Sequence, residues 1–397
     1  MDKIYELLTR RVDKIYPSKE ALEKTLRSGK KLRLYQGFDP STPNLHIGHL
    51  VGLLKLAEFQ KQGHEVIFLI GDFTGMIGDP SGKLESRKTL TKKQVLVNAK
   101  TYQKQASTVL NFFGKNPAKL KFNSKWNSQL KFADVLKLAR HFTVQQLIER
   151  DMFKKRLKEG KEIYFNEFMY PLVQGYDSVV MEVDLEIGGS DQMFNMMAGR
   201  KLAKEILNKE KFVLTTKLLA DAQGNKIGKT EGNVINIAQS PEKFYSQIMS
   251  LADAAILPCL ELVTNLSLEK IEGIKKALAQ GKNPMIYKKM LAFELTKMLN
   301  NESAAKKAQA EFEKVFQQRK LPTKIPEIKI REGEWNIIDL LMETKLCSSR
   351  SEAKRLLKQG AIEIDKKQLT INNQQLTINN DTIIKAGKRK FVRLIVK

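Results

Sequence analysis

Cysteine is scarce in this chain, whose 397 residues include only Cys259 and Cys347. Two thiols are too few for a disulfide framework or a cysteine metal cage, and such usage is typical of the reducing cytosol. Apolar runs are short as well, and none approaches the roughly 18 residues that a transmembrane helix needs. The first residues include acids and lack a long apolar core, so they resemble neither a signal peptide nor a transit peptide. We therefore expect a cytoplasmic protein with no metal site of its own.

Acidic residues are in the minority. Lys and Arg total 69 against 44 Asp and Glu, which gives a net charge of +25 and a pI near 9.7. This balance predicts a polyanionic partner, although a generally lysine-rich proteome would produce it too. The charge is densest in residues 335–397, which carry +7, while residues 1–232 carry +14 and the stretch 151–200 carries −3. Charge alone therefore suggests an anion without saying which one.

Strand-like and helix-like segments alternate through the first half of the chain. The patterns predict helices at 47–62 and 191–208, and buried strands at 31–38, 64–73, 119–123 and 183–189. This alternation is typical of an α/β fold, with a parallel sheet and helices on both of its faces. Ligands bind to such sheets at the carboxyl ends of the strands.

The rest of the chain is predicted to form further domains. Residues 236–320 show a helical pattern without strong strands, and residues 321–334, which hold two prolines, indicate an extended linker. Residues 335–397 predict a small α+β unit in which two short helices precede several strands. The string QLTINN occurs at 368–373 and again at 375–380, which we interpret as a duplication in a surface hairpin.

Only four histidines occur, and His46 and His49 lie three residues apart. After a strand and a turn, this spacing places both on one face at the start of a helix. A helix N-terminus offers unpaired N–H groups and a partial positive charge, which suit a phosphate. Gly48 between them leaves room for a flat ring or a sugar to approach the backbone. Taken alone, such a pair is more often two polar helix residues without a ligand.

The string around these histidines, LYQGFDPSTPNLHIGHLVGLLKL, resembles the HIGH signature region of the class I aminoacyl-tRNA synthetases. In detail it is similar to that of the tyrosyl-tRNA synthetases. The blocks GDFTGMIGDPSGK at 71–83, YPLVQGYDSV at 170–179 and IGGSDQ at 187–192 follow in that family's order. The loop GNKIGKTEGN at 224–233 stands where the family has its KMSKS signature, but Ile227, Gly228 and Thr230 replace a Met and two serines.

This resemblance covers the whole chain and implies its organisation. Residues 1–235 would form a Rossmann-like catalytic domain, and residues 236–320 a helical anticodon-binding domain. After the linker 321–334, residues 335–397 would form the small RNA-binding domain known as the alpha-L motif. The block IGGSDQ is followed by Met193-Phe194-Asn195, which concerns the subgroup rather than the reaction.

The resemblance implies an enzyme, a tyrosine–tRNA ligase that works as a homodimer. It would activate L-tyrosine with ATP and transfer it to the 3′ end of tRNA(Tyr). The tyrosine carboxylate is already ionised, so its attack on the α-phosphate needs donors and cations for the phosphates rather than a general base. Mg²⁺ is expected with ATP, and no carboxylate cage for a metal is evident. The implied catalytic residues are His46 and His49 as donors, Lys226 and Lys229 as mobile cations, and Lys83 and Arg87 on the other side.

The same resemblance implies the binding residues. Those for tyrosine are Tyr35 and Asp177 at the phenol hydroxyl, with Asp79, Tyr170, Gln174 and Gln192 at or near the ammonium. Those for ATP are Asp39, Asp191, His46, Gly48, His49 and Lys229. Contact with RNA is assigned to Lys354, Arg355 and Lys358 on a predicted tail helix, and to Lys388 and Arg389. The segment 101–150, which carries +7, would contact the acceptor arm of tRNA or lie near a dimer interface.

Three other functions fit part of the pattern. The tryptophanyl-tRNA synthetases share the core, but Tyr35 with Asp177 and the C-terminal RNA-binding module argue against them. A synthetase-derived RNA-binding protein without catalysis would not need the intact histidines and lysines. A nucleotidyltransferase that does not act on tRNA would not need the two C-terminal domains. We also note that Tyr35, on an apolar strand, would by itself be interpreted as a core residue.

Overall fold

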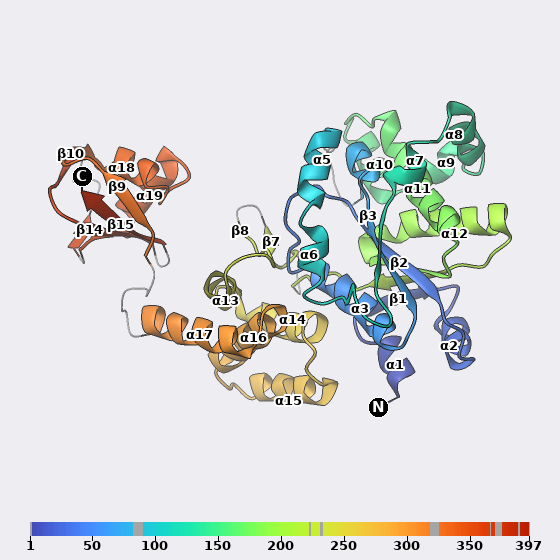
Figure 1. The fold of residues 1–397 in the computed structure, drawn as a ribbon, viewed down its shortest axis with the longest axis horizontal. Helices are drawn as coiled ribbons and strands as arrows, with labels where there is room; N and C mark the ends of the chain where they lie inside the picture. The colour runs from blue at the N-terminus through green and yellow to red at the C-terminus, as the bar shows by residue number, and fades with distance from the viewer. Residues whose placement is uncertain are drawn as a thin grey trace. The chain divides into compact units, whose positions relative to one another are not determined.

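The computed structural model describes residues 2–81, 90–221, 224–230, 233–317, 325–365, 367–369, 375–387 and 390–396. The chain forms two compact units, Met1–Lys306 and Lys307–Lys397 (Figure 1). Each unit has its own sheet and its own hydrophobic core.

Unit 1 is built on a six-stranded sheet with the order β1-β6-β5-β2-β3-β4. Strands β2 to β6 are parallel, and β1 pairs antiparallel with β6 at the edge. The predicted parallel α/β fold is therefore confirmed, while the short strands β1 and β6 were not predicted. The strands are β1 (Val12–Tyr16), β2 (Arg33–Phe38), β3 (Glu65–Ile70), β4 (Lys119–Phe122), β5 (Leu185–Gly189) and β6 (Phe212–Thr216).

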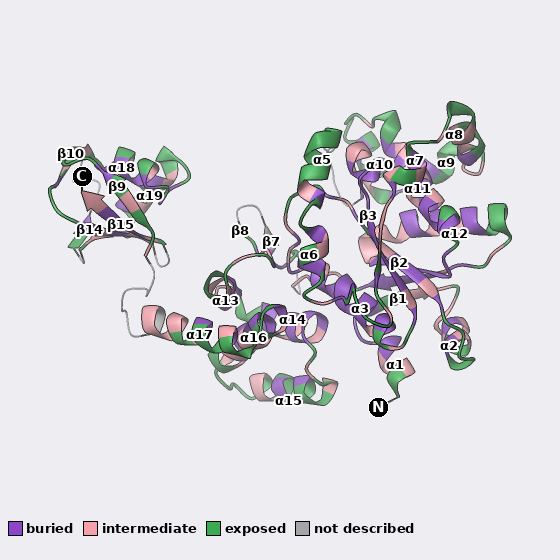
Figure 2. Ribbon diagram, viewed as in Figure 1, coloured by how far each residue is buried: buried purple, intermediate pink, exposed green. Residues whose placement is uncertain are grey.

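Helices cover both faces of this sheet because the inner strands carry apolar side chains on both faces. In β3 the run EVIFLI is buried from Val66 to Ile70, as expected for an inner parallel strand. The helix α3 (His49–Lys61) contacts β2, β3 and β5 and is buried along almost its whole length (Figure 2). The helices α11 (Phe165–Val180) and α12 (Met193–Leu207) pack against each other, and α12 also contacts β5 and β6.

Shorter helices complete the part of unit 1 that surrounds the sheet. They are α1 (Lys3–Leu7), α2 (Lys19–Arg27), α4 (Thr74–Ile77), α5 (Lys92–Ala99), α6 (Tyr102–Ala106), α7 (Ser124–Asn127), α8 (Phe132–Ala139), α9 (Val144–Ile148), α10 (Asp151–Lys158) and the 3₁₀ turn η1 (Ser190–Gln192). A small hairpin of β7 (Lys229–Thr230) and β8 (Asn233–Val234) follows.

The predicted helical region follows this hairpin. It consists of α13 (Pro241–Met249), η2 (Asp253–Ala255), α14 (Ile256–Val263), α15 (Leu268–Ala279), α16 (Pro284–Leu299), α17 (Glu302–Phe312) and the π-helical turn η3 (Glu313–Gln317). Among the described residues, no single helix is long and apolar enough to cross a membrane. Only the pair Pro241–Met249 and Asp253–Val263, bent by 111°, passes that test together.

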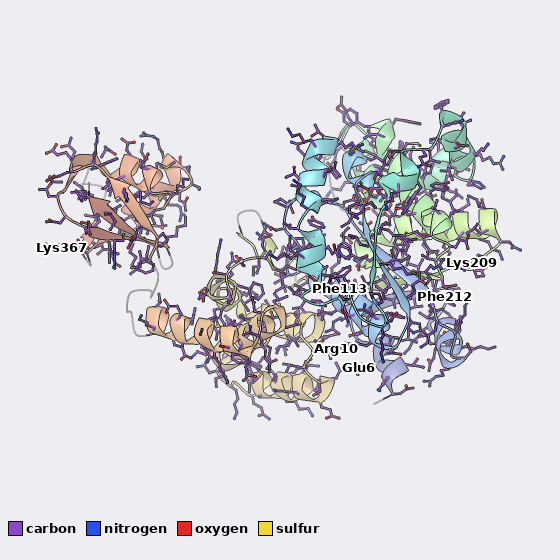
Figure 3. All side chains as sticks on the ribbon, viewed as in Figure 1. Glu6, Arg10, Phe113, Lys209, Phe212 and Lys367 are labelled. Atoms are coloured by element: carbon purple, nitrogen blue, oxygen red, sulfur yellow. The ribbon has the colours of Figure 1, made fainter. Side chains whose placement is uncertain are left out.

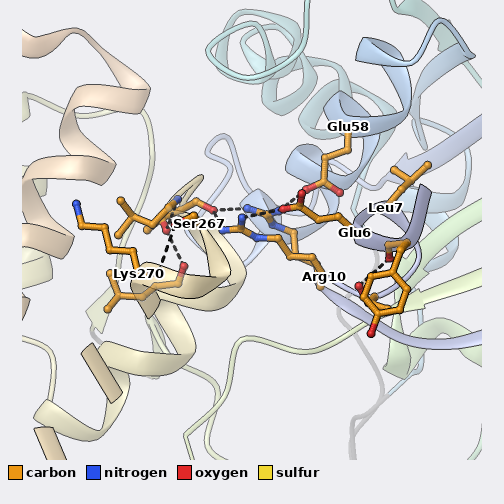
Figure 4. A network of polar contacts seen from close by, with 12 residues as sticks. Glu6, Leu7, Arg10, Glu58, Ser267 and Lys270 are labelled. Atoms are coloured by element: carbon orange, nitrogen blue, oxygen red, sulfur yellow. Dashed lines mark hydrogen bonds and ion pairs between the residues drawn. The ribbon is translucent and has the colours of Figure 1, made fainter. Parts of the chain in front are cut away.

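Buried cations near the start of the chain join this helical region to the sheet. Arg10 and Arg11 lie between α1 and β1, and both are buried. Arg10 Nη2 donates to the carbonyl of Thr264 at 2.7 Å, and Arg11 Nε donates to that of Leu262 at 2.8 Å. These carbonyls lie at the C-terminal end of α14, where the last carbonyls of a helix have no N–H partner within the helix. Figure 4 shows Arg10 and Glu58 in this network.

The helix α3 belongs to the same network. Lys55 Nζ donates to the carbonyl of Leu7 at 2.7 Å and lies 2.5 Å from Glu58 Oε2. Glu58 also accepts a hydrogen bond from Arg11. Burial lowers the pKa of Arg11 to about 10 and that of Lys55 to about 8, while the carboxylate of Glu58 opposes both shifts. Residues 236–306 therefore form one compact unit with the sheet, and the expected domain boundary at 235/236 does not separate two units.

Unit 2 is a small α+β structure with a separate core. A five-stranded sheet has the order β12-β11-β14-β15-β9, and β10 pairs with β13. The predicted tail helices are present as α18 (Ile337–Glu343) and α19 (Arg350–Lys358). The strands are β9 (Glu327–Ile330), β10 (Gly333–Asn336), β11 (Ile362–Ile364), β12 (Lys367–Leu369), β13 (Gln375–Ile378), β14 (Thr382–Ala386) and β15 (Lys390–Val396).

Two sequence expectations change in unit 2. The stretch 321–334 was expected to be a linker, but β9 pairs in parallel with β15, and β10 begins at Gly333. The prolines had indicated a linker, yet they precede β9 and leave its pairing intact. The described residues of the two QLTINN strings pair with other strands, since β12 joins β11 and β13 joins β10.

Candidate active site

A pocket opens at the carboxyl ends of β2 and β5, where the order of the strands reverses direction. Most of the candidate residues predicted from the sequence stand at the ends of these strands or in the segments that follow them. The pocket is lined by these predicted residues: Tyr35, Asp39, His46, Gly48, His49, Asp79, Tyr170, Gln174, Asp177, Asp191, Gln192 and Lys226.

The two histidines are held in one tautomer by backbone donors. The N–H of Gly48 donates to His46 Nδ1 at 3.1 Å, and the N–H of His46 donates to His49 Nδ1 at 3.0 Å. A ring nitrogen that accepts carries no proton, so each neutral ring has its proton on Nε2. The rings stack with centroids 3.8 Å apart. The start of α3 therefore presents two imidazole N–H donors as one group.

The lysine loop, which is the described part of residues 224–233 and carries Lys226 and Lys229, lies against the segment that holds the two histidines. The N–H of Ile47 donates to the carbonyl of Ile235 at 2.9 Å, and the N–H of Ile235 donates to that of Gly228 at 3.0 Å. These bonds seat the β7–β8 hairpin beside the histidines. Lys226 Nζ lies 3.0 Å from Asp191 Oδ2, and both side chains are partly exposed in the pocket. Of Lys229, the structure describes the backbone, in β7.

Asp177 is buried and surrounded by donors. Its Oδ1 accepts from Trp126 Nε1 at 2.7 Å and from Asn127 Nδ2 at 2.9 Å, and its Oδ2 accepts from Asn123 Nδ2 at 3.1 Å. Burial raises the pKa of Asp177 to about 7, although all three donors act to lower it. A carboxylate in this setting can accept one more hydrogen bond from the pocket.

Asp39 is linked to Asp177 through polar side chains. Asp39 Oδ1 accepts from Thr74 Oγ1 at 2.7 Å, and its Oδ2 accepts from Tyr170 at 2.8 Å. Asn123 Nδ2 donates to the same Thr74 hydroxyl at 3.0 Å and also to Asp177. Gly71 makes room for this arrangement, because an added Cβ would lie 1.9 Å from Asp39 Oδ1.

Asp79 is fixed by the loop that carries it and by α12. Gln192 Nε2 donates to Asp79 Oδ2 at 2.6 Å, and the N–H of Ser81 donates to Oδ1 at 2.9 Å. Asn195 Nδ2 contacts Asp79 and Ser81, and the buried Arg150 donates to Ser81 Oγ at 2.7 Å. The Asp79 carboxylate is therefore fixed in position on this side of the pocket.

On the opposite wall, Tyr35 and Gln174 also have fixed partners. The hydroxyl of Tyr35, fully buried on β2, lies 2.9 Å from Ser178 Oγ on α11. Gln174 Nε2 donates to Glu186 Oε1 at 3.0 Å. Since Glu186 can only accept, the amide nitrogen of Gln174 faces it and the amide oxygen faces away.

The remaining predicted residues fall into two groups. Lys83 and Arg87, and the tail residues Lys388 and Arg389, lie outside the described residues. The other three residues assigned to RNA lie in unit 2, exposed on α19; they are Lys354, Arg355 and Lys358.

Several residues of the site were missed by sequence reasoning. The trio Asn123, Trp126 and Asn127 follows the predicted strand 119–123, so its place at a carboxyl end was an available signal. Ser178 stands inside the block 170–179, and Glu186 directly precedes the block 187–192. Ser81 stands inside the block 71–83, close to Asp79. No local signal indicates Lys211 or Arg150, because their side-chain partners are distant in the sequence. Among the described residues, no group of three or more His, Cys, Asp or Glu is arranged to hold a metal.

Comparison with protein families gives two matches that together cover most of the chain. Residues 27–317 match the family described as tRNA synthetases class I (W and Y). Residues 316–394 match the Tyrosine--tRNA ligase SYY-like C-terminal domain.

Curated relatives are similar over nearly the full length. A tyrosine–tRNA ligase of Thermotoga maritima is 42% identical over 391 residues, which are 98% of this chain and 96% of that protein. The tyrosine–tRNA ligase of Colwellia psychrerythraea is 44% identical over 394 residues, 98% of this chain and 97% of that protein.

Solved structures are similar in fold at low identity. A C-terminally truncated mitochondrial tyrosyl-tRNA synthetase of Aspergillus nidulans matches with a TM-score of 0.67 and 21% identity, covering 80% of this chain and 95% of that one. The Archaeoglobus fulgidus tyrosyl-tRNA synthetase complexed with L-tyrosine matches with a TM-score of 0.60 and 22% identity, covering 78% and 99%. At these identities the likeness shows a shared fold.

Proposed function

The chain belongs to the class I tRNA synthetases of the tryptophan and tyrosine type, and from this membership we infer that it is a tyrosine–tRNA ligase. It activates L-tyrosine with ATP and transfers it to the 3′ end of tRNA(Tyr). The observation that carries this function is the full-length similarity to tyrosine–tRNA ligases, which includes a tyrosine-type C-terminal domain. The tryptophanyl alternative is not supported by either.

We propose that Tyr35 and Asp177 recognise the phenol hydroxyl of tyrosine. Both are buried and line the pocket, where a phenylalanine ring would leave unpaired the hydrogen bond that each offers to a ligand. An unpaired buried polar group is costly, and this family is itself the usual illustration of such discrimination. The ammonium is assigned to Gln174, Tyr170 and Asp79. The fixed orientation of the Gln174 amide supports this, because its oxygen is the atom turned away from Glu186.

The phosphates of ATP are assigned to donors and cations at the start of α3 and in the lysine loop. The Nε2–H groups of His46 and His49 would stabilise the charge that develops on the α-phosphate as pyrophosphate leaves. Lys226 would exchange Asp191 for the phosphates, with Lys229 as a second cation from the same hairpin. Asp39 and Asp191 are assigned to the nucleotide and its ribose, and Gly48 to the backbone beside them. Lys83 and Arg87 are proposed as further cations.

Mg²⁺ is proposed to enter with the substrate, on the phosphates of ATP. The carboxylates of the pocket support this, because Asp39, Asp79 and Asp177 are each committed to protein donors. We place the reaction in the cytoplasm, which agrees with two buried, unpaired thiols, Cys259 and Cys347.

The assembly is proposed to be a homodimer that binds tRNA with its C-terminal parts. Phe132 and Leu136 on α8 and Phe165 on α11 are exposed by 77%, 55% and 76%, and α8 contacts α11. A second copy of the chain would cover exposed apolar side chains of this kind. We assign the anticodon to the helical residues 236–320 and further RNA contact to 335–397, whose helix α19 carries exposed cations.

The test is ATP–pyrophosphate exchange driven by tyrosine, followed by charging of tRNA(Tyr). We expect exchange with tyrosine and little with tryptophan or phenylalanine. Exchange driven by tryptophan alone would identify the sister activity instead. A protein that binds tRNA but supports no exchange would identify a non-catalytic RNA-binding protein and refute the proposal.

A further inference from the structure

A buried ion pair lies next to the part of α11 that lines the pocket. It consists of Glu186 on β5 and Lys211 just before β6, which are both buried to at least 98%. Lys211 stands in the sequence between Lys209 and Phe212, both of which are labelled in Figure 3. Burying two opposite charges is unfavourable unless their hydrogen bonds are well satisfied. The partners of the two charges therefore indicate what the pair does.

Glu186 is held by Lys211 and accepts from a residue of the pocket. Lys211 Nζ donates to Glu186 Oε2, to Ser178 Oγ at 2.7 Å and to the carbonyl of Met196 at 3.3 Å. The ammonium group of Lys211 is thus fixed by three acceptors, and it fixes the carboxylate of Glu186 in turn. The other oxygen of that carboxylate, Oε1, accepts from Gln174 Nε2 at 3.0 Å.

The contact with Glu186 determines which way the Gln174 amide faces. A carboxylate that is paired with a lysine can only accept, so Gln174 turns its NH₂ group toward Glu186. The reverse orientation would bring the amide oxygen against a carboxylate oxygen. The amide oxygen is therefore turned away from Glu186, in a side chain that lines the pocket.

Gln174 then belongs to a set of three acceptors that line the pocket. Tyr170 stands four residues before it, on the same face of α11, and donates its one hydrogen to Asp39 at 2.8 Å. Toward any other group Tyr170 can therefore only accept. The third acceptor is the carboxylate of Asp79. A primary ammonium group has three hydrogens, so each acceptor would receive one.

We propose that Glu186 and Lys211 are positioning residues that hold the Gln174 amide with its oxygen toward the substrate, so that the site selects ligands with a primary ammonium group. The inference rests on the proposed function, because it deepens how the site recognises the amino acid. The pair acts through Gln174. Without the pair, the Gln174 side chain would become ordered only when the ligand binds, and the loss of its rotamer freedom would weaken binding.

The double variant Glu186→Met/Lys211→Met tests this role. It removes both charges together, so no buried charge is left unpaired. The readout is the dissociation constant of L-tyrosine compared with that of 3-(4-hydroxyphenyl)propanoate, which has the same ring and carboxylate but no ammonium. Equilibrium dialysis with labelled tyrosine, and with the analogue as competitor, gives both values. We expect the preference for tyrosine over the analogue to fall by about fivefold, while changes at the ring affect both ligands alike.

Two further variants show whether the pair acts through Gln174. Gln174→Met should lower the preference by itself, and adding Glu186→Met/Lys211→Met to it should lower the preference no further. The matched control is Ser178→Ala, which removes a different buried partner of the same ion pair and leaves the contact between Gln174 and Glu186 in place. Its preference for tyrosine should equal that of the wild type.

The outcomes separate this inference from the proposed function. No ATP–pyrophosphate exchange with tyrosine in the wild-type protein would refute the function itself. Where the wild type supports exchange, equal weakening of both ligands in the double variant would show a structural role only and overturn the inference. A further fall in the Gln174→Met background would mean that the pair acts on the ammonium directly, and would overturn the positioning role. If the double variant does not fold, Gln174→Met still decides, because an unchanged preference in that protein overturns the inference.

Discussion

Asp177 is a carboxyl group in the pocket that is buried to 99% and accepts hydrogen bonds from three neutral donors, Asn123, Trp126 and Asn127. Neutral donors stabilise its charge only partly, so burial dominates and its pKa rises from 3.8 to about 7. The folded protein therefore holds a proton that the unfolded chain releases at lower pH.

The sign of the resulting pH dependence is fixed. Stability from the bound proton is fully present below the ordinary pKa of 3.8 and is lost as the pH rises through about 7. Relative to Asp177→Asn, which does not titrate, the wild-type free energy of unfolding should fall by roughly 2–3 kcal/mol between about pH 5 and 8. Urea unfolding of both proteins at the two pH values measures this. Parallel changes in the two proteins would contradict the assignment.

A second residue-scale prediction concerns Gly228 in the lysine loop. Its φ is +67°, and an added Cβ would lie 2.6 Å from Ile47 Cγ2, just before α3. Gly228→Ala should push the hairpin away from the histidines and slow tyrosine activation by about tenfold, with the KM for tyrosine little changed. The matched control is Gly224→Ala, where φ is +83° and nothing lies within 4 Å. Equal effects of the two would indicate backbone strain alone.

How far single residues could be predicted depends on where their partners lie in the sequence. His46, Asp177 and Lys226 are recognisable because each stands in a contiguous block. Lys211 is not, since its importance comes from Glu186 and Ser178, which reach it only in the folded sheet. The tautomer of the histidines likewise depends on backbone N–H groups that a sequence does not display.

Among the elements, α3 connects the site with the helical region. It begins at His49 in the pocket, and its residues Lys55 and Glu58 belong to the network of polar contacts near Arg10. Glu58 is labelled in Figure 4. Through Arg11 the same network reaches the end of α14. The element that presents the histidines is therefore fixed at its far end by the region assigned to the anticodon.

Arg11→Met tests how strongly this network holds the elements together. The variant leaves Glu58 with one cation fewer and removes the Arg11 donor from the Leu262 carbonyl, so unfolding should become easier by about 3 kcal/mol. Hydrogen exchange should rise in α14 and α15 more than in β2 and β3. Arg27→Met, which breaks ion pairs on the surface, is the control and should change little. A small effect of both would mean that packing alone joins the region to the sheet.

The elements themselves follow from the sequence where apolar runs are long. The strands β2 and β3 were predicted, at 31–38 and 64–73, because apolar residues dominate these segments. β3 is buried from Val66 to Ile70, and β2 buries Leu34, Tyr35 and Phe38. The edge strand β1, with exposed residues at its second and third positions, carries too weak a pattern. Composition likewise does not reveal the buried cations that join residues 236–306 to the sheet.

For the whole molecule, the division into two units changes how the C-terminal part should be removed. A cut at 334/335 would follow the predicted domains, but it would leave β9 without β15 and β10 without β13. Unpaired strand edges promote aggregation, so loss of activity in such a protein would say nothing about tRNA. A chain that ends at residue 317 keeps the helical region intact and removes all of these strands.

We expect this shortened chain to retain tyrosine-dependent exchange and to lose most charging of tRNA(Tyr), because the pocket lies entirely in unit 1.

A second protein, of full length, tests the cations of α19. It carries Lys354→Glu, Arg355→Glu and Lys358→Glu on the exposed face of that helix. It should bind tRNA more weakly at low salt, and its affinity should depend less steeply on salt than that of the wild type, since fewer counterions are released. Filter binding over a salt series, with exchange measured in parallel, gives both quantities. Undiminished charging by the shortened chain would remove unit 2 from tRNA recognition, and an unchanged salt slope in the charge variant would move the contact away from α19.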